Sequence, residues 1–88
     1  MQFPDRVRWR SEKFGAVLFD TLNEKIYVTN ETGKEILLLI EDGLNVSSIV
    51  NRLRETFENG ETIESDLAEF LGDLVSKGLL MEEGVEKP

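Results

Sequence analysis

The sequence of 88 residues contains no cysteine and no histidine. The absence of cysteine excludes disulfides and thiol chemistry, and the absence of histidine removes the imidazole base and the commonest zinc ligand. A catalytic site would have to use carboxylates, lysine and hydroxyl groups alone. No phosphate-binding glycine-rich loop, G-x-S-x-G motif or metal-ligand spacing is present. We therefore expect a binding protein with no catalytic residues, no cofactor and no metal.

Long apolar runs are also missing. The longest, ILLLI at residues 36–40, has five residues, whereas a membrane-spanning helix needs about 18 or more. The N-terminal MQFPDRVRWR carries charges where a secretory signal peptide has its apolar centre. We expect a cytoplasmic protein that does not associate with membranes.

Negative charge is abundant and unevenly placed. The formal net charge is −8; residues 1–60 contain ten acids and eight bases, whereas residues 61–88 contain eight acids and two bases. Proteins that bind nucleic acids usually present a basic surface, so this distribution favours another kind of partner. The acidic end also favours solubility.

Period-two patterns near the N-terminus predict strands. Arg6, Arg8 and Arg10 alternate with Val7 and Trp9, which is typical of a strand with one basic and one apolar face. Residues 14–22 and 25–29 are rich in β-branched and aromatic residues and predict two more strands. A short turn between them, in which Asn23 tolerates the left-handed conformation, completes an antiparallel meander.

The remainder of the chain predicts three helices, over residues 31–41, 46–57 and 63–77. Asn30 is a suitable N-cap for the first helix, although Thr32 and Glu35 have the spacing of a capping box that would start it two residues later. Gly43 and Gly78 are expected to end the first and third helices. ENGET, residues 58–62, is expected to be a loop.

The third predicted helix has an apolar arc about 140° wide, compared with the roughly 100° that a small core requires. Phe70 lies at one margin of this arc and Val75 at the other. One margin could therefore face something other than the core. The whole pattern predicts an α+β fold of order βββααα, with residues 1–81 as one domain and residues 82–88 as a frayed acidic tail.

The third predicted strand has a free edge in such a meander. Edges are normally protected by charge, proline or a bulge, yet Ile26, Tyr27 and Val28 are apolar and only Lys25 is charged. Such an edge is an aggregation hazard, a homodimer interface or a docking strand for an extended peptide. The physics of the sequence leaves all three alternatives open.

Several segments together resemble the PqqD-like family, the peptide-recognition elements of pathways that make ribosomally synthesised, post-translationally modified peptides. These segments cover about residues 5–81 and are, in order, FGAVLFD, NETGKEIL, EDGLNVSSIVNRLRETF and DLAEFLGDLVSKGLL. FGAVLFD also resembles members that accompany radical-SAM peptide maturases. The chain departs from the family at Thr29, where leucine is usual before the asparagine.

The resemblance implies a winged helix-turn-helix-like fold and a role as a peptide chaperone. The leader segment of a precursor peptide would add as a fourth antiparallel strand beside the third strand, in a groove walled by the third helix. Acids flanking Phe70 would then favour Lys or Arg in the leader. Carried onto this chain, the peptide-binding residues are Lys25, Ile26, Tyr27, Val28, Thr29, Asp66, Leu67, Phe70, Leu71, Asp73 and Leu74.

A second surface would contact a modifying enzyme, expected to be a radical-SAM maturase. We assign it to Arg6, Arg8 and Arg10, with a solvated strand face as the alternative. Two other functions stay open. A structural or dimerising subunit would pair its edge with a second copy, and a winged-helix DNA-binding protein would need a basic recognition helix, for which the second helix offers only Arg52 and Arg54.

Overall fold

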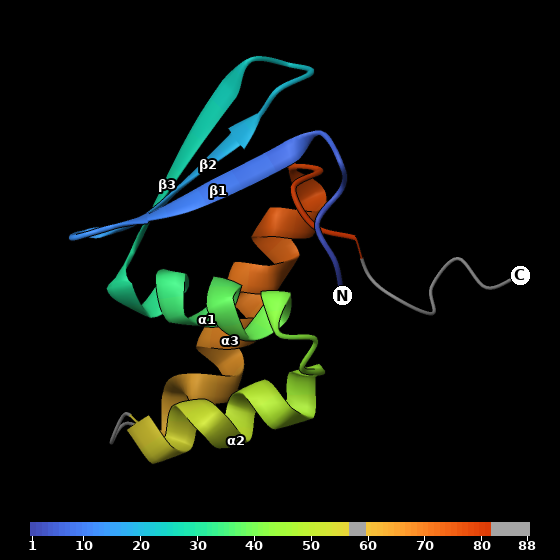
Figure 1. The fold of residues 1–88 in the computed structure, drawn as a ribbon. Coiled ribbons are helices and arrows are strands. Elements are labelled where there is room, and N and C mark those ends of the chain that lie inside the picture. Colours follow the sequence, from blue (N-terminus) through green and yellow to red (C-terminus); the bar gives the residue numbers. More distant parts are fainter. Residues whose placement is uncertain (57–59, 82–88) are drawn as a thin grey trace, which may run out of the picture.

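A computed structural model describes residues 1–56 and 60–81 of the chain. Three strands are followed by three helices, an α+β fold as predicted (Figure 1). The elements are β1 (Val7–Glu12), β2 (Gly15–Asp20), β3 (Lys25–Asn30), α1 (Glu31–Glu41), α2 (Val46–Thr56) and α3 (Gly60–Ser76). The predicted acidic tail, residues 82–88, and position 57 at the predicted end of the second helix lie outside the described residues.

The three strands form one antiparallel sheet in the order β1-β2-β3. In the register, Trp9 pairs with Leu18 and Leu18 with Tyr27, whereas Phe19 pairs with Ile26. Residues directly opposite each other share a face, so Leu18 and Tyr27 lie on one face of the sheet and Phe19 and Ile26 on the other. Leu18 is fully buried and Ile26 is exposed, which identifies the Leu18 face as the one that covers the core.

β3 passes into α1 without a loop, because Asn30 ends the strand and caps the helix. Its backbone is extended (φ −85°, ψ −171°), and its side-chain oxygen accepts a hydrogen bond of 2.9 Å from the Gly33 N–H. This cap confirms the expected helix start at Glu31. Gly43 ends the helix in the left-handed conformation, with φ +88°. In the β2–β3 turn the left-handed residue is Glu24 (φ +58°), not Asn23 as predicted.

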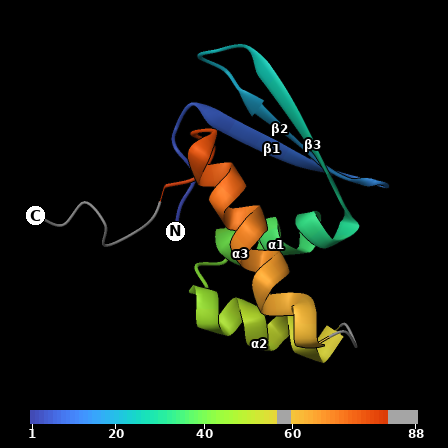
Figure 2. The ribbon, with the colours of Figure 1, turned by 180° about the vertical axis from the view of Figure 1, so that it is seen from behind.

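The helices form a second layer beneath the sheet, with α1 next to it and α2 farther away (Figure 1). Seen from behind, α3 extends from beside α2 up to the sheet (Figure 2). α3 begins at Gly60, so residues 60–62 are helical and the prediction of a loop there is wrong. The core contains apolar side chains from both layers, of which Leu18, Leu37, Ile49, Leu67 and Leu79 are the largest that are fully buried.

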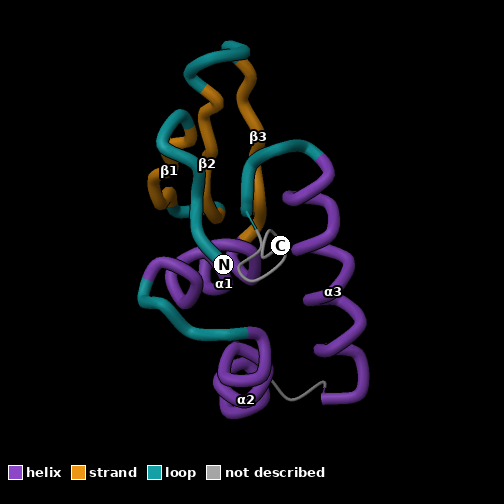
Figure 3. The backbone as a smooth tube through the Cα atoms, turned by 90° about the vertical axis from the view of Figure 1, so that its right-hand side faces the viewer, coloured by secondary structure: helices purple, strands orange, loops and turns teal. Residues whose placement is uncertain are grey.

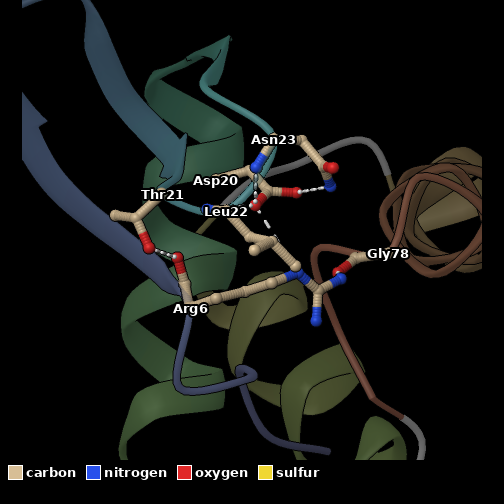
Figure 4. A network of polar contacts seen from close by, with 6 residues as sticks. All are labelled: Arg6, Asp20, Thr21, Leu22, Asn23 and Gly78. Atoms are coloured by element: carbon tan, nitrogen blue, oxygen red, sulfur yellow. Dashed lines mark hydrogen bonds and ion pairs between the residues drawn. The ribbon is translucent and has the colours of Figure 1, made fainter.

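The chain ends of the domain are tied together by polar contacts. Gln2 and Met81 form an antiparallel bridge, with hydrogen bonds of 3.0 and 2.8 Å between their backbones. The Arg6 guanidinium donates to the Gly78 carbonyl oxygen at 2.7 Å and lies 3.5 Å from the Asp20 carboxylate (Figure 4). Arg6 therefore joins the start of β1 and the end of β2 to the turn after α3.

Asp20 is the acceptor at the centre of this network (Figure 4). The Asn23 side-chain amide donates to it at 2.9 Å, and the backbone N–H groups of Asn23 and Leu22 each donate at 3.1 Å. The Asn23 side chain is the main cause of a lowered Asp20 pKa, helped by the two backbone donors and by Arg6, while burial acts in the opposite direction. The ionised carboxylate of Asp20 therefore stabilises the β2–β3 turn.

None of the helices in the described part of the chain is both long and apolar enough to cross a membrane.

The lowered pKa gives a testable pH dependence. A carboxyl group whose pKa is lower in the folded state stabilises the fold above its unfolded pKa of about 4, and the contribution disappears as the pH falls through the folded value. The stability difference between wild type and Asp20→Asn should therefore be largest near neutral pH and shrink below about pH 4. Urea unfolding from neutral to acidic pH measures this difference, with Glu35→Gln, an exposed carboxylate of α1, as the control. A difference that is constant with pH would contradict the assignment.

Candidate functional site

The outer edge of β3 is free of backbone partners within residues 1–56 and 60–81, because β3 pairs only with β2. One hydrogen bond is enough to assign which backbone N–H and C=O groups of β3 point outward. The Thr21 N–H donates to the Arg6 carbonyl oxygen at 2.9 Å, so Thr21 directs its backbone groups toward β1. Backbone direction alternates along an antiparallel strand, so Leu18, three residues away, directs its groups toward β3.

The same alternation sorts the residues of β3. Tyr27 and Thr29 pair with Leu18 and Ala16, and they therefore use their backbone N–H and C=O groups to bond β2. Ile26 and Val28 alternate with Tyr27 and Thr29 along the strand and therefore direct these groups outward. The free edge thus offers two donors and two acceptors at alternate residues, the pattern that another extended chain needs in order to pair.

The side chains of β3 divide between the two faces of the sheet. Ile26 and Val28 are on the outer face, where 61% and 64% of their surface is exposed. Tyr27 and Thr29 are half-buried on the helical side. A chain added beside β3 would alternate in the same way, with every second side chain directed toward the helices.

Among the three strands, β3 lies nearest α3 (Figure 3). The Lys77 ammonium, just beyond α3, is 6.0 Å from the centre of the Tyr27 ring. An open groove of about 730 Å³, which we call the β3–α3 groove, lies where the end of β3 and the first turns of α1 face α3. Asn30, Thr32, Gly33 and Ile36 line one side of it. The α3 side is lined by Asp66, Glu69, Phe70, Gly72, Asp73 and Ser76.

The α3 wall of this groove is acidic. Asp73 is paired with Lys77 at 2.5 Å, but Asp66 and Glu69 form no ion pair with any residue that the structure describes. Both are exposed at the surface. Phe70 is half-buried and supplies the apolar part of the wall. The groove therefore combines an aromatic surface with uncompensated negative charge.

The predicted peptide-binding residues do not all reach this groove. Phe70, Asp66 and Asp73 line it. Leu67, Leu71 and Leu74 are instead buried in the core, with 1%, 8% and 4% of their surface exposed, because they occupy the middle of the wide apolar arc of α3. The contribution of these leucines is to hold α3 in place.

The predicted basic face is divided. Arg8 and Arg10 are exposed on the outer face of the sheet, where the Arg10 guanidinium lies 5.7 Å from the Phe19 ring centre and pairs with Glu12 at 2.7 Å. Arg6 is not part of this surface, since it precedes β1 and is held by Gly78 and Asp20. The surface expected for three arginines therefore has two.

Sequence reasoning did not single out Gly33, Ile36, Glu69 and Gly72 as groove residues. Glu69 could have been found, because it is on the same helical face as Asp66 and Asp73. Gly33, Ile36 and Gly72 face the groove only once α1 is placed against α3, and no pattern within either helix carries that information. No group of three or more potential metal ligands occurs in the described ranges, 1–56 and 60–81.

The meander, the three helices and the groove beside the open edge define an α+β domain of the winged helix-turn-helix-like class. The chain belongs to the PqqD family: residues 15–80, most of its length, match the family described as coenzyme PQQ synthesis protein D. No curated protein matches the chain.

Two solved structures resemble the whole domain. One is TbiB1 in complex with the TbiA(beta) leader peptide, with a TM-score of 0.85 and 27% identity over 99% of this chain and 100% of that chain. The other is lasso peptide synthetase B1 complexed with the leader peptide, with a TM-score of 0.83 and 20% identity over 92% of this chain and 96% of that chain. At 20% identity, the likeness to the second structure shows a shared fold and nothing more.

The direction of the backbone groups in β3 makes a prediction about proline. Val28→Pro removes an N–H that has no partner, so the domain should stay folded with a single cooperative transition. Tyr27→Pro removes an N–H bonded to β2 and should destabilise the fold by about 1–3 kcal/mol from the unsatisfied partner alone. Urea unfolding of the two variants measures the difference. Equal loss of stability in both would show that the assigned alternation is wrong.

Proposed function

We propose that this protein binds the leader segment of a ribosomally synthesised precursor peptide and presents it to a modifying enzyme. The observation that carries the proposal is the free edge at Ile26 and Val28, on the strand whose last residue, Asn30, lines the β3–α3 groove. The leader adds to β3 as a fourth strand. Its backbone bonds the edge, and every second side chain enters the groove.

This mode of binding separates affinity from selectivity. Backbone pairing with Ile26 and Val28 tolerates many sequences, because it uses no leader side chain. The groove beside Phe70 then selects among leaders by the side chains at alternate positions. The likeness to TbiB1 in complex with the TbiA(beta) leader peptide supports this function, as does membership of the PqqD family.

The protein acts on the peptide by presentation and performs no chemistry itself. A leader held at the domain raises the effective concentration of the attached segment at the active site of the enzyme, to the millimolar range for short flexible linkages. The proposal includes the enzyme class expected from the sequence: the modifying enzyme is a radical-SAM maturase.

The enzyme contacts the outer face of the sheet. Arg8 and Arg10 lie there beside Phe19, Ile26 and Val28, and the register places Arg8, Phe19 and Ile26 in one row across the three strands. This face is exposed and apolar with a basic border. It is also on the opposite side of the sheet from the groove, so leader and enzyme bind together without competing.

Selection from a display library of random peptides tests the leader site. Peptides selected on the wild type should bind Val28→Pro at least roughly tenfold more weakly, because the ring blocks pairing at the edge. Leu38→Ala, which alters an exposed apolar residue of α1, should leave affinity unchanged. Isothermal calorimetry gives both values. Selected peptides that bind Val28→Pro with full affinity would refute strand addition at β3.

Self-association of the edge is checked in the same preparation. Sedimentation of the protein with and without a selected peptide should give a monomer in both cases. A dimer that the peptide dissociates would assign the edge of β3 to contacts between copies.

Charge reversal tests the enzyme surface. Arg8→Glu with Arg10→Glu should weaken association with the modifying enzyme and leave peptide affinity intact, since neither residue lines the groove. Arg6 is left unchanged, because its contacts with Gly78 and Asp20 support the fold. Loss of peptide affinity in the double variant would mean that the two surfaces have been assigned the wrong way round.

A further inference from the structure

Gly72 is a glycine within α3 that packing does not explain. A β-carbon placed on it would have no atom within 4 Å, and its φ is not positive. Apart from proline, glycine is the least favourable residue inside a helix, so an alanine here would fit and favour the fold. Gly72 lines the β3–α3 groove, and its missing side chain leaves that groove wide.

Gly33 lines the groove and lies close to both Thr29 of β3 and Phe70 of α3. A β-carbon on Gly33 would lie 2.2 Å from the Thr29 hydroxyl oxygen and 3.2 Å from a ring carbon of Phe70. The first turn of α1 therefore brings Thr29 and Phe70 to the same place. Thr29 is on the helical side of the sheet, so the leader residue that pairs with Thr29 directs its side chain to Phe70.

The charges at this place determine which side chain fits. Asp66 and Glu69 line the same wall of the groove as Phe70 and are not ion-paired with any described residue. Asp73 is ion-paired with Lys77. An acidic leader side chain would be repelled there. A lysine or arginine would place its aliphatic stem against the aromatic ring and its charged end among the carboxylates.

We propose that the β3–α3 groove takes one lysine or arginine of the leader, at the position that pairs with Thr29, and that Gly72 keeps the groove open for it. The inference rests on the proposed function and adds to it the kind of leader side chain that the groove selects.

Peptide selection tests the occupant. Random peptides are selected by display on the wild type and, in parallel, on the double variant Asp66→Asn, Glu69→Gln. Selection on the wild type should enrich lysine or arginine at one position of the aligned peptides, and selection on the double variant should lose that enrichment. The two substitutions preserve the size of the side chains, so the groove keeps its shape.

A thermodynamic cycle on one selected peptide shows whether the cation contacts these carboxylates. Replacing its enriched lysine by norleucine should weaken binding to the wild type roughly tenfold at low salt, and binding to the double variant much less. The effect should decrease as salt is added. Equal losses in both proteins would place the lysine elsewhere and overturn the inference.

Gly72→Leu tests the need for an open groove. The leucine projects into space that is empty in the free protein, so the thermal midpoint should stay the same or rise, while affinity for the selected peptide should fall at least roughly tenfold. Ala68→Leu is the matched control, an exposed position of α3 that does not line the groove, and it should leave affinity unchanged. Unchanged affinity in Gly72→Leu overturns the role of Gly72.

The outcomes separate this inference from the proposed function. Peptides that lose affinity for Val28→Pro but carry apolar or acidic residues opposite Thr29 overturn the inference and keep strand addition. Peptides that bind Val28→Pro normally overturn both.

Discussion

The feature on which the rest of the structure depends is the direct passage from β3 to α1 at Asn30. One residue is both the last of the strand and the cap of the helix, through its hydrogen bond to the Gly33 N–H. Because no loop intervenes, the first turn of α1 lies directly against Thr29, which only a glycine at position 33 permits. The edge of β3 is thereby held open next to a helical wall. A longer connection would let α1 move away and would remove one side of the groove.

The side chains of α3 fall into two groups, one buried in the core and one that lines the groove. The buried leucines of α3, Leu67, Leu71 and Leu74, fix the helix against the core. Phe70 and the acidic residues occupy the margin of the same helix. They are not buried in the core and line the groove, where a ligand can reach them. The extra width of the apolar arc is thus explained at one margin: Phe70 faces the groove. A single helix thus contributes to the core through one face and, in the proposed function, to the peptide-binding groove through the adjacent face.

Most of the fold could be predicted from the sequence, because local signals agree with one another. The strand alternation, Asn30 as a cap and Gly43 as a stop all act within a few residues and place β3 and α1 closely. The groove was less accessible to prediction, since it depends on the approach of α1 to α3. Arg6 shows the same limit, because period-two alternation placed it with Arg8, whereas a contact with Gly78, distant in sequence, decides its role.

The fold class alone would have allowed a different ligand. Winged helix-turn-helix domains serve both DNA and peptide recognition, so the site must be judged by its own chemistry. DNA binding requires many phosphates to be neutralised by lysine and arginine, and here the exposed side of α3 presents Asp66, Glu69 and Asp73. An extended peptide needs only a vacant strand edge and a few pockets, and it tolerates or exploits negative charge. The charges on α3 therefore disfavour DNA as a ligand and favour a peptide that pairs with β3.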